Sequence, residues 1–173
     1  KHTLLFNLVL FSFTAVSQEI EEVVVTATKK AESTQDLAIS IEAFTADQLS
    51  TEQIYDMTDL AEVVPGLEVA KGVGSGSAWS MRGIGSYGVG AAVVSSMVTS
   101  VNGHSTNVSY MNDMGFMDLE RIEVLKGPQG TLFGRNSVAG VINLVTNRPS
   151  SELEGSFDIE RGDWGRETFN AVI

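Results

Sequence analysis

Hydrophobic and polar positions alternate most clearly in the last third of the chain. Within residues 119–126, Ile122 and Val124 fall on one face of a strand, and we expect Glu123 and Lys126 to lie outside that core face. Residues 141–146 form a second apolar run with strand character. The stretch between them is rich in glycine and contains one proline. The pattern predicts two strands joined by a sharp elbow, which brings Arg135 and Asn136 close to Lys126.

The middle of the chain predicts a strand, two short helices and another strand, in that order. Ile39 and Ile41 alternate as in a strand, and Thr45-x-x-Gln48 has the spacing of a capping box. Residues 57–63 form a helix candidate that ends before Pro65 and Gly66. Glycine- and serine-rich residues 71–79 then predict a loop, and a β-branched run ends at the turn signal Asn102-Gly103. Together with the two strands and the elbow above, these elements indicate a compact α+β fold.

The first residues resemble an export signal. Lys1 precedes a largely apolar run over residues 4–16, and small residues follow before Gln18. The run is shorter than the ~20 residues that a membrane-spanning helix needs. We therefore expect residues 1–17 to be a secretory signal peptide, with a buried helix as the alternative. Because the sequence begins with Lys rather than Met, we expect a fragment.

Residues 18–36 contain a short segment that favours extended backbone. Val23, Val24 and Val25 precede Thr26, and the flanks are polar and charged. Such flanks leave the strand without a face to bury in its own chain. It either adds to the sheet edge of another protein or serves as the first strand of its own domain, and the residues alone leave both alternatives open.

Composition narrows the function classes. The chain has 173 residues, with 11 basic and 22 acidic side chains and a net charge of −11, which disfavours a nucleic-acid partner. It contains no cysteine, so thiol catalysis and thiolate metal sites are excluded. The length suggests one folded domain.

No arrangement of residues indicates catalysis or a bound cofactor. Residues 83–88 fit G-x-G-x-x-G, but no acidic residue follows at the distance that a dinucleotide site requires. The glycines at 127, 130 and 134 lack the G-K-[ST] ending of a phosphate loop. His104 is the one histidine after the signal segment, which gives neither a catalytic triad nor a metal-ligand spacing. We expect a protein that is not an enzyme and holds no cofactor or metal.

Several motifs together resemble a known family. "MRGIG" at residues 81–85 and "LERIEVLKGPQGTLFGRNSVAGVINLVTNRP" at residues 119–149 are similar to the plug domain of TonB-dependent outer-membrane receptors. "EEVVVTA" at residues 21–27 looks like a TonB box, and "DLAEVVPGLEV" at residues 59–69 matches the plug's helix-to-strand step. Two mild departures are Asn102, where the family often has Asp, and Lys126, where Arg is common.

The resemblance implies a fold and a domain division. The fold is an α+β plug with a small mixed sheet and short helices, lodged in a barrel of ~22 strands. Residues 1–17 are then the signal peptide and 18–36 the TonB box with a flexible segment. Residues 37–150 form the plug, and residues 151–173 begin a truncated transmembrane β-barrel. Apolar residues alternate with polar ones from Leu153 to Ile159 and again from Phe169 to Ile173, as expected for strands with one face to lipid.

The resemblance also implies partners and site residues. The partners are the C-terminal domain of TonB with its inner-membrane energising complex, the protein's own barrel, the outer membrane and a small-molecule ligand. The TonB-binding residues are Glu22, Val23, Val24, Val25, Thr26 and Ala27. The ligand-facing loop residues are Ser75, Ser77, Trp79, Ser86, Tyr87, His104, Asn107 and Tyr110. The residues that contact acidic groups of the barrel wall are Arg82, Arg121, Lys126 and Arg135.

The implied function is energised import of a scarce ligand, an iron–siderophore or similar compound, into the periplasm. The implied location is the cell outer membrane, with the plug in the barrel lumen and the TonB box on the periplasmic side. Two other functions stay open. One is a free periplasmic ligand-binding or signalling module, and the more distant one is a dinucleotide-binding enzyme.

Overall fold

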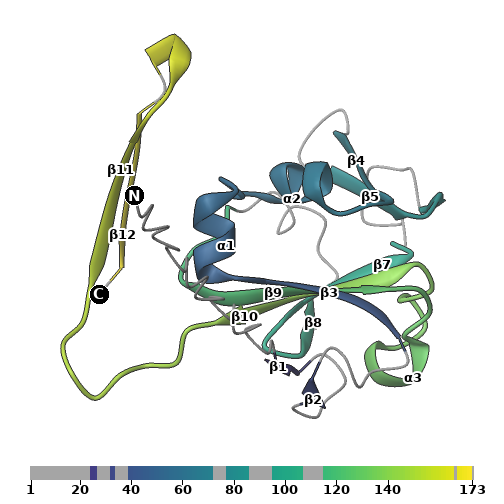
Figure 1. Cartoon of the computed structure of the whole chain (residues 1–173). Coiled ribbons are helices and arrows are strands. Elements are labelled where there is room, and N and C mark those ends of the chain that lie inside the picture. Colours follow the sequence, from purple (N-terminus) through teal and green to yellow (C-terminus); the bar gives the residue numbers. More distant parts are fainter. Residues whose placement is uncertain are drawn as a thin grey trace, which may run out of the picture.

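A computed structural model describes residues 24–26, 32–33, 39–71, 77–85, 95–106, 115–165 and 167–172 (Figure 1). The predicted signal peptide lies outside these residues. Among the residues described, no helix is long and apolar enough to cross a membrane. The helices are α1 (Ala46–Thr51), α2 (Met57–Val63), α3 (Gly130–Phe133) and the 3-10 helix η2 (Asp163–Gly165). The strands are β1 (Val24–Val25), β2 (Glu32–Ser33), β3 (Ser40–Thr45), β4 (Leu67–Lys71), β5 (Ser77–Met81), β6 (Ile84–Gly85), β7 (Met97–Val101), β8 (His104–Thr106), β9 (Leu119–Lys126), β10 (Gly140–Thr146), β11 (Ser156–Arg161) and β12 (Glu167–Val172).

A five-stranded sheet in the order β3-β9-β10-β7-β8 forms the centre of the molecule. Strands β10 and β7 run parallel, whereas the other neighbours are antiparallel, so the sheet is mixed as predicted. The register places Ile142 opposite Val124 and Asn143 opposite Glu123. Because side chains alternate along each strand, the apolar pair points to one face of the sheet and the polar pair points to the other.

Both predicted helices are present, and each begins with a capping box. Thr45 Oγ1 accepts a hydrogen bond from Gln48 N, and Gln48 Oε1 accepts one from Thr45 N. Asp56 caps α2 by accepting hydrogen bonds from Thr58 N and Asp59 N. These caps satisfy amide donors that the first turn of a helix leaves without partners. The predicted bounds of α2, residues 57–63, are confirmed.

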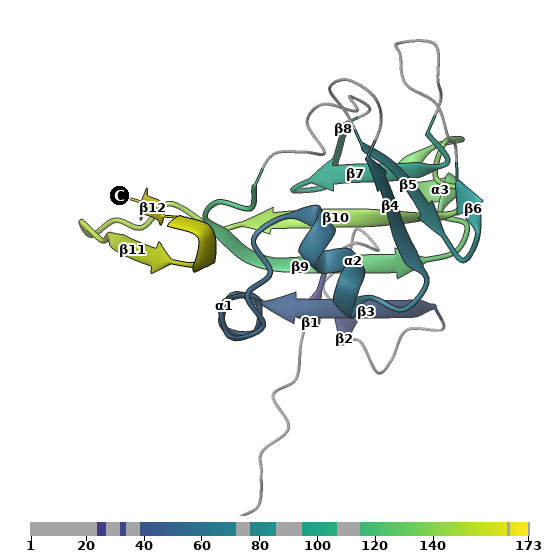
Figure 2. The same cartoon turned by 90° about the horizontal axis from the view of Figure 1, so that it is seen from above.

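The main core lies on one face of the central sheet. Helices α1 and α2 and strands β4 and β5 cover this face, as both views show (Figures 1 and 2). Leu60 of α2 is 0% exposed and packs with Ile122, Val124 and Ile142 of the sheet. Burial of apolar surface over the whole face stabilises this side of the molecule.

Strands β7 and β8 are joined by the predicted Asn102-Gly103 turn. Val101 pairs with His104, so the loop has two residues, and both have positive φ angles of 49° and 79°. Two-residue hairpin loops of this kind require left-handed backbone, which Asn and Gly adopt most easily. The sequence signal therefore identified this hairpin correctly.

The elbow between β9 and β10 is more structured than the sequence predicted. It contains helix α3, and its two arms are linked by backbone hydrogen bonds from Gly127 N to Ala139 O and from Gln129 N to Ser137 O. A Cβ atom on Gly140 would lie 2.5 Å from Leu125 O, so the two strands approach closely only because this residue is glycine.

Strands β11 and β12 form a separate antiparallel hairpin. Phe157 lies opposite Ala171, and Ile159 lies opposite Phe169, so the predicted apolar positions share one face. Phe157, Ile159 and Phe169 are all exposed, and the rings of the two phenylalanines are 6.3 Å apart. Strand β11 begins at Ser156, within the stretch whose alternation predicted a strand.

Candidate partner-binding strand and its docking site

The second face of the central sheet carries a polar site. Strands β1 and β2 lie on this face, opposite the helices α1 and α2 (Figure 1). They form an antiparallel pair in which Val24 is opposite Ser33. Val24 is exposed, but Val25 is 0% exposed and Thr26 contacts the sheet through hydrogen bonds. The segment is thus docked on its own chain.

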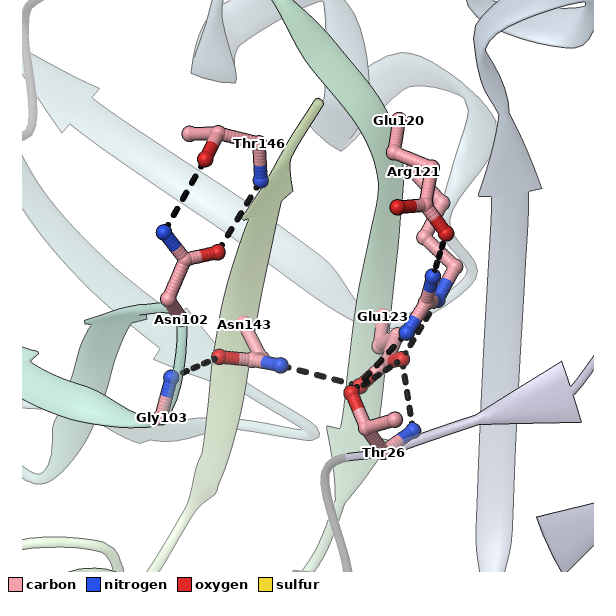
Figure 3. Close-up of polar contacts among 8 residues, drawn as sticks. All are labelled: Thr26, Asn102, Gly103, Glu120, Arg121, Glu123, Asn143 and Thr146. Carbon is pink, nitrogen blue, oxygen red and sulfur yellow. Dashed lines mark hydrogen bonds and ion pairs between the residues drawn. The ribbon is translucent and has the colours of Figure 1, made fainter. Parts of the chain in front are cut away.

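Glu123 is the centre of this site (Figure 3). Its side chain is 0% exposed, yet its carboxylate is well satisfied. Oε1 accepts hydrogen bonds from Thr26 N at 2.8 Å, from Thr26 Oγ1 at 3.3 Å and from Arg121 Nε at 2.8 Å. Oε2 accepts one from Asn143 Nδ2 at 2.9 Å. A buried carboxylate is tolerated when it is paired and hydrogen-bonded in this way.

Arg121 closes the site toward the surface, with 11% of its side chain exposed. Its guanidinium pairs with Glu123 and, through Nη1, with the more exposed Glu120. Nη2 also donates a hydrogen bond to Thr26 Oγ1 at 2.9 Å. The Thr26 hydroxyl therefore accepts from the arginine and donates to the glutamate, which fixes its orientation.

Asn143 connects Glu123 to the β7–β8 turn (Figure 3). While its Nδ2 donates to Glu123, its Oδ1 accepts a hydrogen bond from Gly103 N at 3.1 Å. Asn102 in the same turn exchanges two hydrogen bonds with Thr146 at the end of β10. A continuous polar path thus runs from the docked segment to a hairpin turn 40 residues before Asn143 in the sequence.

The predicted TonB-binding residues are partly described. Val24, Val25 and Thr26 lie in or next to β1, whereas Glu22, Val23 and Ala27 lie outside the described residues. The expectation that this strand has no face to bury in its own chain is wrong, because Val25 is buried and Thr26 bonds to Glu123. A polar strip on the sheet supplies the partner that local sequence did not reveal.

Two of the four predicted barrel-contacting cations already have partners within the chain. Lys126 is buried and donates to Glu42 Oε1 at 2.6 Å and to Pro65 O at 3.1 Å. Arg121 is paired as described above. Barrel contact is thus not needed to satisfy either charge.

The expectation that Lys126 lies outside the core face is also wrong. It follows Ile122 and Val124 at intervals of two residues and so shares their face, and its side chain is buried. Glu123 does point away from the helices, but β1 covers it. Arg82 and Arg135 are exposed, and Arg82 Nη2 donates to Ser40 Oγ. The barrel contacts of all four cations stay a prediction.

The structure describes only some of the predicted ligand-facing residues, and two of these lie in a strand rather than a loop. Ser75, Ser86, Tyr87, Asn107 and Tyr110 lie outside the described residues. The predicted loop placement of Ser77 and Trp79 is wrong, because both lie in strand β5. Trp79 is 4% exposed and belongs to the core, where its large apolar surface is needed for packing.

His104 is exposed at the start of strand β8. It follows the Asn102-Gly103 turn, which is tied through Asn143 and Glu123 to Thr26. Its ligand-facing role stays a prediction.

Residues 83–85 form a turn and the short strand β6 rather than the strand-to-helix step of a dinucleotide site. Within the described part of the chain, no group of three His, Cys, Asp or Glu side chains is arranged to hold a metal ion.

Sequence reasoning missed Glu123, Asn143 and Glu42 as functional or pairing residues. A signal was present for the first two, because each is a polar residue flanked on both sides by apolar residues in a strand. Their importance depends on the cross-strand register that sets them opposite each other, which no local pattern gives.

Comparison with known proteins gives a consistent result. The family described as "TonB-dependent Receptor Plug Domain" matches residues 33–141. The iron-regulated outer membrane virulence protein of Vibrio cholerae serotype O1 is 30% identical over 158 residues, which cover 87% of this chain and 24% of that protein. The vitamin B12 transporter BtuB of Vibrio vulnificus is 33% identical over 141 residues, covering 80% of this chain and 22% of the transporter.

A solved structure agrees with these sequence matches. The ferric yersiniabactin uptake receptor FyuA from Yersinia pestis is 30% identical and superposes with a TM-score of 0.60. The match covers 70% of this chain and 18% of the receptor. The chain thus spans about a quarter or less of the length of the proteins it resembles.

Proposed function

Because this chain belongs to the TonB-dependent receptor plug family, we propose that it is the plug region of a receptor that imports a scarce small-molecule ligand. Its relatives are receptors and transporters rather than enzymes, and its place is the cell outer membrane. The observation that carries the proposal is the docked β segment Val24–Thr26, which lies just before the matched plug domain.

The partner in this proposal is the C-terminal domain of TonB with its inner-membrane energising complex. An extended segment binds such a domain by adding a strand to its sheet, with affinity from main-chain hydrogen bonds. In the docked state Val25 is buried and Thr26 N is bonded to Glu123. The segment therefore has to leave the sheet before TonB binds it, and pulling on it then opens a path past the plug.

Import also requires the ligand and TonB sites to be coupled. A ligand shifts the segment toward release only if it binds the two plug states with different affinity. The ligand class that we propose is an iron–siderophore complex or a compound of similar size, such as cobalamin. Support comes from the relatives, whose names refer to iron regulation, ferric yersiniabactin and vitamin B12.

The β11–β12 hairpin fits the beginning of the barrel around the plug. Its exposed apolar residues share one face, which suits a strand pair with one side to lipid. In the proposed receptor this face contacts the outer membrane. The exposed Arg82 and Arg135 are then available to acidic groups on the barrel wall.

Replacement of Val24 by proline tests the proposal. Proline removes a backbone N–H and fixes φ, which disrupts strand addition to TonB. We expect Val24→Pro in the full receptor to reduce crosslinking to TonB and uptake of radiolabelled iron–siderophore and cobalamin, while ligand binding at the cell surface persists. Val24→Ala is the matched control, because it keeps the N–H and should keep uptake. Normal uptake by the proline variant would contradict the assignment.

A further inference from the structure

We propose that the Glu123 carboxylate is the catch that holds the partner-binding segment on the sheet, and that its charge sets how often the segment is free to bind TonB. The inference rests on the proposed function and adds the regulation of the same site. It names a residue far from the segment in sequence, since 97 positions separate Thr26 from Glu123.

Glu123 joins the segment to the sheet through both backbone and side chain. Thr26 gives the carboxylate two hydrogen bonds, from its N–H and its hydroxyl. Arg121 adds a bond to each of Thr26 and Glu123, so the three residues form a closed triangle. Hydrogen bonds to a charged group are stronger than those between neutral groups, and here they converge on one oxygen.

The same geometry permits reversal. When the segment leaves, Glu123 retains Arg121 and Asn143 as partners, and water replaces the bonds from Thr26. Arg121, which is partly exposed, retains Glu120 and Glu123. No buried charge loses all of its partners, so undocking avoids the large penalty of an unpaired buried charge.

Asn143 holds the carboxylate in the orientation that Thr26 needs. Its amide donates to Oε2, which leaves Oε1 turned toward Thr26 and Arg121. The orientation of the amide is itself set by Gly103 N, which donates to Asn143 Oδ1. The β7–β8 turn therefore acts on the catch through Asn143, and a shift of that turn weakens the hold on Thr26.

Replacement of Glu123 by glutamine separates charge from shape. Glutamine has one acceptor oxygen, so it cannot serve Thr26 and Arg121 on one side and Asn143 on the other. If Asn143 flips to correct the mismatch, Gly103 N loses its acceptor instead. At least one hydrogen bond is lost in either arrangement. The bonds from Thr26 also lose their charged acceptor, and the ion pair between Arg121 and residue 123 is lost.

The test measures exposure of Val25 in the full receptor. The chain contains no cysteine, so Val25→Cys adds a single thiol to it, at a position that is fully buried when the segment is docked. We expect Glu123→Gln to raise the rate of maleimide labelling at residue 25 about tenfold. Glu120→Gln is the matched control, because it removes a carboxylate from the same arginine and leaves the bonds to Thr26, so its rate should change less than about twofold.

A second thiol distinguishes undocking from unfolding. Val98→Cys lies in the sheet and is 1% exposed, so its labelling should stay slow in both glutamine variants. Fast labelling at residue 25 alone supports the catch. Equal rates at residue 25 in the unmodified, Glu123→Gln and Glu120→Gln proteins would overturn it, and so would fast labelling at residue 98 to the same extent.

Binding of the purified TonB C-terminal domain separates this inference from the proposed function. If Glu123→Gln speeds labelling at residue 25 and also increases TonB binding, the proposed function and the role of Glu123 are both supported. If labelling rises but TonB does not bind any variant, the catch is correct and the partner assignment is wrong. If TonB binds the unmodified receptor and Glu123→Gln changes neither readout, the function stands and the catch is wrong.

Discussion

The two faces of the central sheet are covered by different kinds of contact. On one face, Leu60, Ile122 and Ile142 belong to a large apolar cluster under two helices. On the other, Val25 and Thr26 cover a strip that contains Glu123, Arg121 and Asn143. Apolar packing is spread over many residues, so no single contact opens the first face. The second face has a smaller apolar cluster, which contains Val98, Leu125, Phe133 and Val141. Beside that cluster, Thr26 is held by a few directional bonds to the Glu123 carboxylate.

The two faces therefore contribute to different properties: one to the folding stability of the plug, and the other to the release of the Val24–Thr26 segment. Apolar burial in the first face contributes to the folding of the whole plug, and its loss destabilises every element that packs there. Polar bonds in the second face are replaced by water when the segment leaves, so their net contribution is small. Polar hydrogen bonds therefore suit the Val24–Thr26 segment, which has to leave the sheet and return to it.

The largest expected effect comes from the apolar face. Leu60→Ala removes a fully buried side chain and should reduce the free energy of unfolding by about 2–5 kcal/mol. Denaturant-dependent labelling at Val98→Cys measures this loss. Leu132→Ala is the control, since Leu132 is exposed and should change stability by less than about 1 kcal/mol. A similar cost for both variants would show that the apolar cluster is not the main source of stability.

The next effect comes from the polar face. Asn143→Asp sets a second carboxylate against Glu123, where a donor now stands 2.9 Å from Oε2. We expect repulsion to release the segment and to reduce stability by about 1–3 kcal/mol. Labelling at Val25→Cys reports the release.

Asn147→Asp is the matched control for this substitution. Asn147 Nδ2 donates to Asp118 at the same distance, 2.9 Å, but the pair is exposed. Repulsion at an exposed pair should cost less than about 1 kcal/mol and leave residue 25 protected. Equal effects of the two aspartates on residue 25 would mean that net charge, rather than the position of Asn143, controls the segment.

A smaller effect is expected at the β7–β8 turn. Gly103→Ala places a side chain at φ 79° and should cost about 1 kcal/mol. Because Gly103 N orients Asn143, the substitution should also raise labelling at residue 25 by a few fold. Gly130→Ala, at a glycine with open space around its Cβ position, should leave both readouts unchanged. Loss of stability without faster labelling at residue 25 would contradict the proposal that the β7–β8 turn acts on Glu123.

Sequence reasoning predicted the elements where the signal is local. The capping residues Thr45 and Asp56 act within three positions of themselves, and Asn102-Gly103 defines its own turn. Helix α3 was missed because four residues that begin with glycine give no helical period. Local patterns and the resemblance to a known family together gave the mixed sheet, its helices and the family.

Contacts between distant positions explain the errors at Trp79 and Thr26, but not the error at Lys126. Trp79 was assigned to a loop because glycines and serines precede it, but the sheet gives it a buried position. Lys126 was assigned to the wrong face, although the two-residue period from Ile122 already gives the correct one. The docking of Thr26 on Glu123 depends on chain segments 97 residues apart, which no motif encodes.

The role of Glu123 is tested most directly by the distance between spin labels at Val24→Cys and Val138→Cys in the full receptor. Both side chains are exposed, so labels should not disturb the core. We predict one narrow distance distribution for the docked state. A second, longer population should grow with Glu123→Gln and further when the TonB C-terminal domain is added. A distribution that neither the substitution nor the TonB domain changes would contradict the claim that Glu123 holds a removable partner-binding strand.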